Sequence, residues 1–165
     1  MFQASKLNVQ TAEDYAMLNK QLEALLDGEQ NAIANLANSS ALLMQALSDI
    51  NWAGFYLWET HSSQLVLGPF QGLPACVRID SGKGVCGTAF ERRQTMRVAN
   101  VHQFPGHIAC DAASQSEIVI PLVREGQAIG VLDIDSPSVN RFSEVDQAGL
   151  EAFVQTLMPF LEQWH

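Results

Sequence analysis

The spacing of apolar residues changes along this chain, and that change restricts the fold to a mixture of helices and antiparallel strands. Residues 11–27 and about 29–48 repeat apolar side chains every three or four positions, which is typical of helices with one buried face. Gly28 separates the two stretches and favours the end of the first helix. Three short runs are rich in strand-forming residues, are bounded by turn residues and are therefore predicted to be strands: 52–58, 64–70 and 74–80.

A second group of elements follows. Residues 85–93 are expected to form a short helix, and residues 98–116 an irregular stretch centred on Pro105-Gly106. The runs 117–123 and 127–135 are strongly apolar and are separated by a short loop that contains glycine, which predicts a hairpin.

The last helix is expected to begin near Ser143, where Asp146 makes a near capping box, and to bend or end at Pro159. This order of elements favours an α+β fold, an antiparallel sheet with helices packed mainly on one face. The other face is then free to hold a ligand beneath the irregular stretch, because so long an unstructured segment in a small domain is usually functional.

The length of 165 residues and the apolar share of 47% fit one domain that covers residues 1–165. Within it we expect helices at about 11–48, the sheet and its loops at about 51–136, and a C-terminal helix at about 143–163.

The charge of the chain narrows the classes of partner. Nine basic and eighteen acidic residues give a net charge of −9, which repels nucleic acids and anionic membranes. The N-terminal segment lacks the apolar core of a signal peptide, and no apolar run has the ~20 residues that span a bilayer. We therefore predict a cytoplasmic protein that binds neither nucleic acid nor membrane, in a compartment where structural disulfides are rare.

Three cysteines, Cys76, Cys86 and Cys110, are the first candidates for chemistry. Taken singly, a cytoplasmic cysteine is usually a small buried apolar residue. Cys110, however, lies in the irregular stretch among polar residues, and His107 three positions earlier would favour its thiolate if the ring turned toward the sulfur. Cys76 and Cys86 flank a glycine-rich turn, so the three together suit a nucleophile with a resolving partner.

Two other interpretations use some of the same residues. His102, His107 and Cys110, with Cys76 or Cys86, offer zinc ligands, but no Cys-x-x-Cys pair occurs and the spacings match no common structural zinc site. The segment 82–87 matches the dinucleotide fingerprint GxGxxG, but it lies in a strand meander and lacks an acidic residue about 20 positions later.

A group of carboxylates is expected at one end of the predicted hairpin. Asp133 and Asp135 are two residues apart on one strand and project from the same face, and Glu117 begins the strand that pairs with it. Carboxylates at strand ends are often only solvated, but here they would end two of the most apolar strands, where like charges are unfavourable without a ligand or a proton. Such a group can bind an ammonium ion or donate a proton from a carboxyl with a raised pKa.

Trp52 and Tyr56 are four residues apart on the first strand and share a face. They are either core residues or, if that face holds the ligand, an apolar wall with polar groups at its edge.

Together these segments resemble the free methionine-(R)-sulfoxide reductases, a family of single GAF domains. The resemblance covers most of the chain from residue 49 to residue 142, and the three cysteines with GHIACDAAS set it apart from general GAF sensor domains. The matching stretches are DINWAGFY (49–56), LGPFQG (67–72), GKGVCGTA (82–89), GHIACD and its continuation to Glu117 (106–117), and GVLDIDS (130–136).

The resemblance implies a six-stranded antiparallel sheet and a redox reaction at sulfur. The cysteine matching Cys110 attacks the sulfoxide sulfur and becomes a sulfenic acid, the one matching Cys76 forms a disulfide with it, and thioredoxin reduces that disulfide. The cysteine matching Cys86 is a less certain participant, an alternative resolving residue.

The resemblance also assigns the binding residues. The residues matching Glu117, Asp133 and Asp135 bind the polar groups of the substrate, and those matching Trp52 and Tyr56 surround its S-methyl group. It implies no metal and no cofactor beyond the electrons from thioredoxin, and it is compatible with a homodimer. The competing hypotheses are a GAF module that binds a small ligand without turnover and a thiol redox sensor without a substrate.

Overall fold

Helices and strands follow one another in the order that the apolar spacing indicates. The computed structural model describes residues 7–108 and 110–164. The α-helices are α1 (Ala12–Leu26), α2 (Ala32–Ala46), α3 (Gly84–Arg92) and α4 (Glu144–Leu157); the strands are β1 (Trp52–Glu59), β2 (Gln64–Gly72), β3 (Arg78–Asp80), β4 (Met96–Val98), β5 (Ser116–Arg124) and β6 (Gln127–Ser136); the 3-10 turns are η1 (Val101–Gln103) and η2 (Met158–Leu161).

The six strands form one antiparallel sheet in the order β3-β2-β1-β6-β5-β4. The two central strands, β1 and β6, are the ones on which Trp52, Tyr56 and the two aspartates lie. The hairpin of β5 and β6 closes at Arg124 and Gln127, as the short loop predicts. The α+β class and the six-stranded sheet are therefore confirmed.

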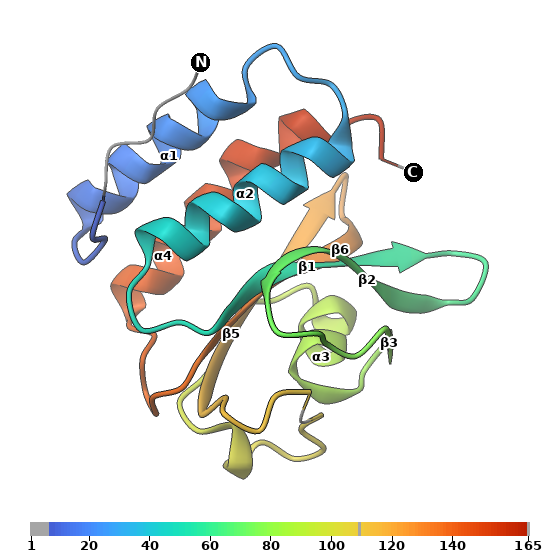
Figure 1. The fold of residues 1–165 in the computed structure, drawn as a ribbon. Helices are drawn as coiled ribbons and strands as arrows, with labels where there is room; N and C mark the ends of the chain where they lie inside the picture. The colour runs from blue at the N-terminus through green and yellow to red at the C-terminus, as the bar shows by residue number, and fades with distance from the viewer. Residues whose placement is uncertain (1–6, 109, 165) are drawn as a thin grey trace.

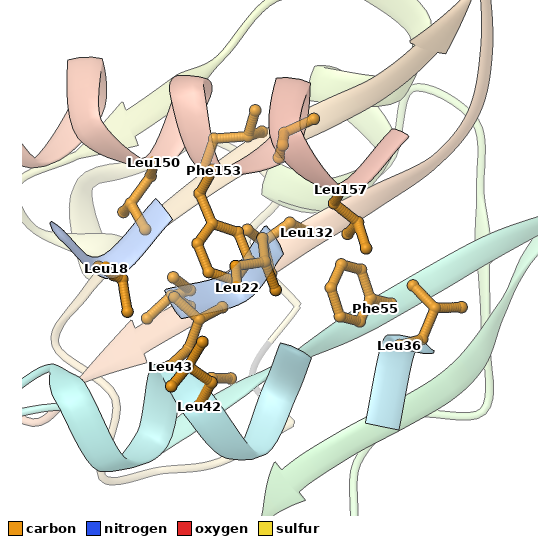
Figure 2. Packing of buried hydrophobic residues seen from close by; sticks show 14 of the residues in the cluster. Leu18, Leu22, Leu36, Leu42, Leu43, Phe55, Leu132, Leu150, Phe153 and Leu157 are labelled. Carbon is orange, nitrogen blue, oxygen red and sulfur yellow. The ribbon is translucent and has the colours of Figure 1, made fainter. Parts of the chain in front are cut away.

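Three of the helices, α1, α2 and α4, cover one face of the sheet (Figure 1). Alternate residues of the central strands point into this layer, such as Phe55 of β1 and Leu132 of β6, both fully buried. Figure 2 shows these two side chains packed against leucines from the helices and against Phe153 of α4. Each such side chain contributes roughly 1.5–3 kcal/mol to folding when it leaves water, so this layer is the main source of stability.

The opposite face of the sheet is covered in part by α3, which corrects the expectation that this face is free (Figure 1). A smaller buried cluster lies between α3 and the strands. Its members are Trp52, Tyr56, Leu65, Ile79, Val85, Cys86, Ala89, Val119 and Val131. The site described below lies beside this cluster, between the sheet, α3 and the loops.

Local signals in the sequence account for both ends of α1 and α4. Thr11 and Ser143 each begin a helix with a complete capping box, through Asp14 and Asp146 respectively. Helix α1 ends at Leu26, just before the glycine that the sequence marks as its end. Pro159 converts the end of α4 into η2, because proline cannot donate the helical hydrogen bond.

Two strands differ from the expectation. The run 74–80 forms a strand only at Arg78–Asp80, because the residues before it leave the sheet and cross toward the pocket. Strand β4, within residues 96–98, pairs with β5 at the edge of the sheet, although three residues are too few to show a period.

Within the described residues no helix combines the length and the apolar character needed to cross a membrane.

Candidate active site

The register of the three central strands brings the predicted carboxylates together. Glu117 of β5 and Trp52 of β1 both pair with Asp135 of β6, and Gly54 pairs with Asp133. All these residues project from the face opposite the helical layer, because their neighbours in sequence point into that layer. Gly54 allows the aromatic residues to pack closely, since a Cβ there would clash with Phe70 of β2 and lie 2.8 Å from the Trp52 ring.

The carboxyl groups are almost fully buried and therefore hold protons unusually strongly. Burial raises the pKa of Glu117 well above its usual range, and the nearby Asp133 and Asp135 add to the rise. Burial and the charge of Asp133 likewise raise the pKa of Asp135. Burial also raises the pKa of Asp133, but hydrogen bonding from Glu117 and Cys86 opposes that rise. Asp133 is thus the most readily ionised of the three, and the protonated form of Glu117 is strongly favoured.

Cys86 belongs to this acidic group. Its thiol lies at the start of α3, with Sγ 3.9 Å from Glu117 Oε1. Burial, followed by the charges of Asp133 and Glu117, raises the pKa of the thiol well above its ordinary value. Cys86 is therefore a neutral thiol, the form that is least reactive as a nucleophile.

His107 faces Glu117, which differs from the sequence hypothesis that its ring supports the Cys110 thiolate. His107 Nε2 lies 3.8 Å from Glu117 Oε2. Burial and the neighbouring His102 lower the pKa of His107, so the imidazole is neutral and its contact joins two uncharged groups. No local signal in the sequence indicates this contact, because it depends on how the loop folds back over β5.

The other two cysteines form a disulfide. Cys76 is bonded to Cys110 across 34 residues of sequence, with 5.6 Å between their Cα atoms, and Cys86 is a free, buried thiol. Both bonded residues are partly exposed and Cys110 lines the pocket, so the disulfide lies at its mouth.

The two aromatic residues hold the segment that carries Cys76. Tyr56 donates a hydrogen bond from its hydroxyl to the main-chain oxygen of Cys76 at 2.9 Å, and Trp52 Nε1 donates to the main-chain oxygen of Leu73 at 3.1 Å. The two rings stack with their centroids 5.9 Å apart, and Phe70 stacks on the far side of Trp52. They therefore form a wall of the pocket and also anchor the loop above it.

Polar contacts secure the loop that carries Cys110. Asn51 Nδ2 donates to Asp111 Oδ2 at 3.1 Å and to Ser114 Oγ at 3.3 Å. Opposite this loop, Gly84 adopts a φ of +61° at the start of α3, and a Cβ there would lie 3.1 Å from Ile108. The glycine-rich segment thus allows α3 and the loop to approach closely. The sequence predicted a close backbone approach at this turn but not that the loop is the partner.

These elements line an open pocket whose empty space is about 550 Å³ when the part open to solvent at its mouth is included. Seven of the eight residues predicted from the sequence line it: Trp52, Tyr56, Cys86, Cys110, Glu117, Asp133 and Asp135. The eighth, Cys76, does not line the pocket itself but is bonded to Cys110 and follows the lining residue Ala75. Eleven further lining residues were not singled out as site residues: Leu73, Pro74, Ala75, Ile79, Lys83, Gly84, Val85, His107, Ile108, Asp111 and Ser114.

The zinc alternative drawn from the sequence does not assemble in this form. Cys76 and Cys110 are bonded to each other and are unavailable as thiolates, and His107 faces Glu117. Among the described residues, one group of three possible metal ligands lies within 4.8 Å, namely Cys86, Glu117 and Asp133. The structure therefore brings together a donor set that the sequence spacing did not suggest.

The chain is similar to proteins of a known family. The family model described as GAF domain matches residues 35–162. The free methionine-R-sulfoxide reductase of Escherichia coli is 59% identical over 145 residues, which are 88% of this chain and 87% of that protein.

Solved structures extend the likeness to the whole fold. The free methionine-R-sulfoxide reductase of Neisseria meningitidis, solved with its substrate, has a TM-score of 0.93 and 41% identity over 98% of this chain and 96% of that one. The reduced form of the Staphylococcus aureus protein named fRMsr has a TM-score of 0.87 and 52% identity over 96% of this chain and 99% of that one. The chain belongs to the GAF domain family and, within it, to the free methionine-R-sulfoxide reductases.

Proposed function

We propose that this protein reduces free methionine (R)-sulfoxide to methionine by thiol chemistry at Cys110. The observation that carries the proposal is the Cys76–Cys110 disulfide at the mouth of a pocket whose base holds Glu117, Asp133 and Asp135. The names of the relatives from Escherichia coli and Neisseria meningitidis supply the substrate.

The first step transfers the sulfoxide oxygen to Cys110. The thiolate and one proton react with the sulfoxide, the sulfur–oxygen bond of the substrate breaks, and Cys110 becomes a sulfenic acid while methionine leaves. The substrate sulfur gains two electrons and the cysteine sulfur loses two. Because the oxygen must be protonated to depart, an acid is needed close to it.

Glu117 is the residue best suited to supply this proton. It is buried, its raised pKa favours the protonated form, and it lines the pocket together with Cys110. Asp133, the most readily ionised member of the group, is suited to the ammonium group of a free amino acid. A peptide-bound methionine sulfoxide lacks that ammonium group and would leave the buried carboxylate unpaired, which favours the free amino acid as substrate.

The second step joins the two partly exposed cysteines. The thiol of Cys76 attacks the sulfur of the sulfenic acid, water leaves, and the disulfide forms. Cys86 is a poorer resolving residue, since it is buried against Glu117 with a raised thiol pKa.

Thioredoxin is the proposed reductant of this disulfide. A dithiol partner must approach one of the two sulfur atoms closely, because exchange proceeds through a mixed disulfide. Three exposed apolar side chains flank the bonded cysteines, Leu73, Val77 and Ile108. They give the mouth of the pocket an apolar surface against which the protein partner can pack.

The decisive experiment mixes pre-reduced protein with equal amounts of free R and S methionine sulfoxide and follows both epimers by chiral chromatography. We expect loss of the R epimer alone, with one methionine formed for each disulfide that appears in the protein. Peptide-bound methionine sulfoxide is the matched control substrate and should remain. If neither epimer is consumed, a GAF module that binds a small ligand without turnover becomes the better account.

The Cys110→Ser variant tests the chemical step. Without the thiolate it should release no methionine in a single turnover, whereas Cys76→Ser should release one equivalent and then recycle slowly with thioredoxin. Substantial methionine release by Cys110→Ser would contradict the assignment of the nucleophile.

A further inference from the structure

Three side chains at the base of the pocket have the donor atoms of a metal site. Cys86 Sγ, one Glu117 oxygen and one Asp133 oxygen all lie within 4.8 Å of one another, and Sγ lies 3.9 Å from Glu117 Oε1. In a tetrahedral zinc site, ligand atoms are about 3.4–3.6 Å apart, given bonds of about 2.3 Å to sulfur and 2.1 Å to oxygen. The three ligand atoms therefore need to move together by about one ångström or less to bind an ion.

A second observation is that one oxygen of this group has no hydrogen-bond partner. Asp133 Oδ1 is buried and has no hydrogen-bond partner, and the residue is only 6% exposed. Buried carboxylate oxygens are almost always hydrogen-bonded or bound to a cation, because an unpaired one is costly. This oxygen belongs to a residue that lines the pocket.

The donor types select the class of ion. A thiolate beside two carboxylates suits zinc and similar thiophilic ions, whereas magnesium and calcium require oxygen ligands. His107 Nε2, 3.8 Å from Glu117 Oε2, offers a nitrogen near the same group. With three protein ligands, the fourth coordination position of the ion stays open to the pocket.

We propose that Cys86, Glu117 and Asp133 form a binding site for a thiophilic divalent cation such as Zn²⁺, and that the ion and the substrate exclude each other from the pocket. Binding converts the Cys86 thiol into a metal-bound thiolate and releases its proton. The ion binds the carboxyl oxygens that the proposed function assigns to the substrate. The mutual exclusion of ion and substrate therefore rests on the proposed function. The ion is then a reversible inhibitor.

The disulfide form of the protein permits a clean test of the first half. Cys76 and Cys110 are bonded in it, and Cys86 is the only free thiol among the three cysteines of the chain. Co²⁺ serves as a coloured substitute for Zn²⁺, because a cobalt–thiolate bond gives a charge-transfer band in the near ultraviolet. We expect one Co²⁺ per chain with this band, displaced by Zn²⁺.

Substitutions decide whether the band belongs to this group. Cys86→Ser should remove it, and Glu117→Gln and Asp133→Asn should each weaken Co²⁺ binding by at least about tenfold. Glu23→Gln, the same change at an exposed residue of α1, is the control and should bind as the unaltered protein does. A missing band in the unaltered protein, or an unchanged one in Cys86→Ser, would overturn the site.

Competition tests the second half. The Cys76→Ser/Cys110→Ser protein keeps Cys86 and performs no turnover, so added free methionine sulfoxide acts only as a ligand. We expect increasing concentrations of the sulfoxide to lower the cobalt–thiolate band until the effect saturates. A site that binds Co²⁺ while free methionine sulfoxide has no effect would overturn the exclusion and would separately count against the proposed substrate, with the metal site left standing.

Discussion

At the scale of single residues, Glu117 links the chemistry of the pocket to the stability of the fold. It is 5% exposed, and its raised pKa has burial as the first cause. The folded protein therefore keeps a proton that the unfolded chain releases above the ordinary value of 4.5. Between that pH and the raised pKa the unfolded chain binds fewer protons, so stability falls as pH rises.

We expect Glu117→Gln to remove this loss. Its free energy of unfolding should exceed that of the unaltered protein at pH 8 by on the order of 1 kcal/mol or more, and the difference should vanish near pH 4. Calorimetry at several pH values measures it, and Glu23→Gln is again the control. Parallel pH profiles for Glu117→Gln and the unaltered protein would mean that Glu117 is not held protonated.

Tyr56 carries a second expectation, because its hydroxyl binds the backbone of Cys76. Tyr56→Phe keeps the ring and loses one hydrogen bond of about 0.5–1.5 kcal/mol, which corresponds to roughly a twofold to tenfold change in rate. We expect normal methionine release in the first turnover but slower disulfide formation, so that sulfenic acid accumulates. Trapping it with dimedone and mass spectrometry provides the measurement; an unchanged rate of disulfide formation would show that the anchor is dispensable.

At the scale of elements, the contact between α1 and α4 depends on one glycine. A Cβ on Gly149 of α4 would meet the ring of Tyr15 of α1, whose hydroxyl donates a 2.6 Å hydrogen bond to Asp146. The two helices can therefore approach closely only because position 149 has no side chain.

Gly149→Ala tests this contact. Helix propensity alone would stabilise the variant by about 1 kcal/mol, whereas overpacking costs about 1–3 kcal/mol. We expect net destabilisation in urea unfolding with catalytic parameters retained, because the helical layer lies on the other face of the sheet from the pocket. Ala148→Gly, at the exposed neighbour, measures the propensity term separately. A more stable Gly149→Ala would mean that the helices can move apart at no cost.

The elements also show where prediction from sequence succeeds and fails. Helices of fifteen residues and the long strands of the hairpin are found because each carries several periods of its pattern. Strand β4 is too short to carry one. The run 74–80 has the composition of a strand, but Tyr56 and Trp52 bind its first half through the backbone and draw it out of the sheet.

At the scale of the whole molecule, the sheet separates a stabilising face from a reactive one, and the disulfide lies where another protein can reach it. Leu73 and Val77 are 63% and 61% exposed, although neither is charged or polar. The chain as a whole is acidic, with eighteen acidic and nine basic residues. An exposed apolar surface beside the disulfide therefore differs from the rest of the chain and suits contact with a protein partner.

We expect Leu73→Ser and Val77→Ser to raise the KM for thioredoxin while turnover with dithiothreitol, a small reductant that needs no docking surface, stays the same. Val139→Ser changes an equally exposed apolar residue outside the pocket lining and should affect neither reaction. Equal KM values for thioredoxin in all four proteins would show that the apolar surface takes no part. A homodimer and a cytoplasmic location stay predictions, which sedimentation and cell fractionation can test.

The sequence by itself determined the order and type of the longer elements, the face on which their residues lie, and the identity of the chemical groups. These follow from periods of 3.6 and 2.0, from caps and from residue types, all of which are local properties. The tertiary structure decided which cysteine partners Cys110, that His107 faces Glu117, and that Cys86 joins the carboxyl group. These depend on segments far apart in the chain, and the shifted pKa values depend on burial, which only the packed molecule creates.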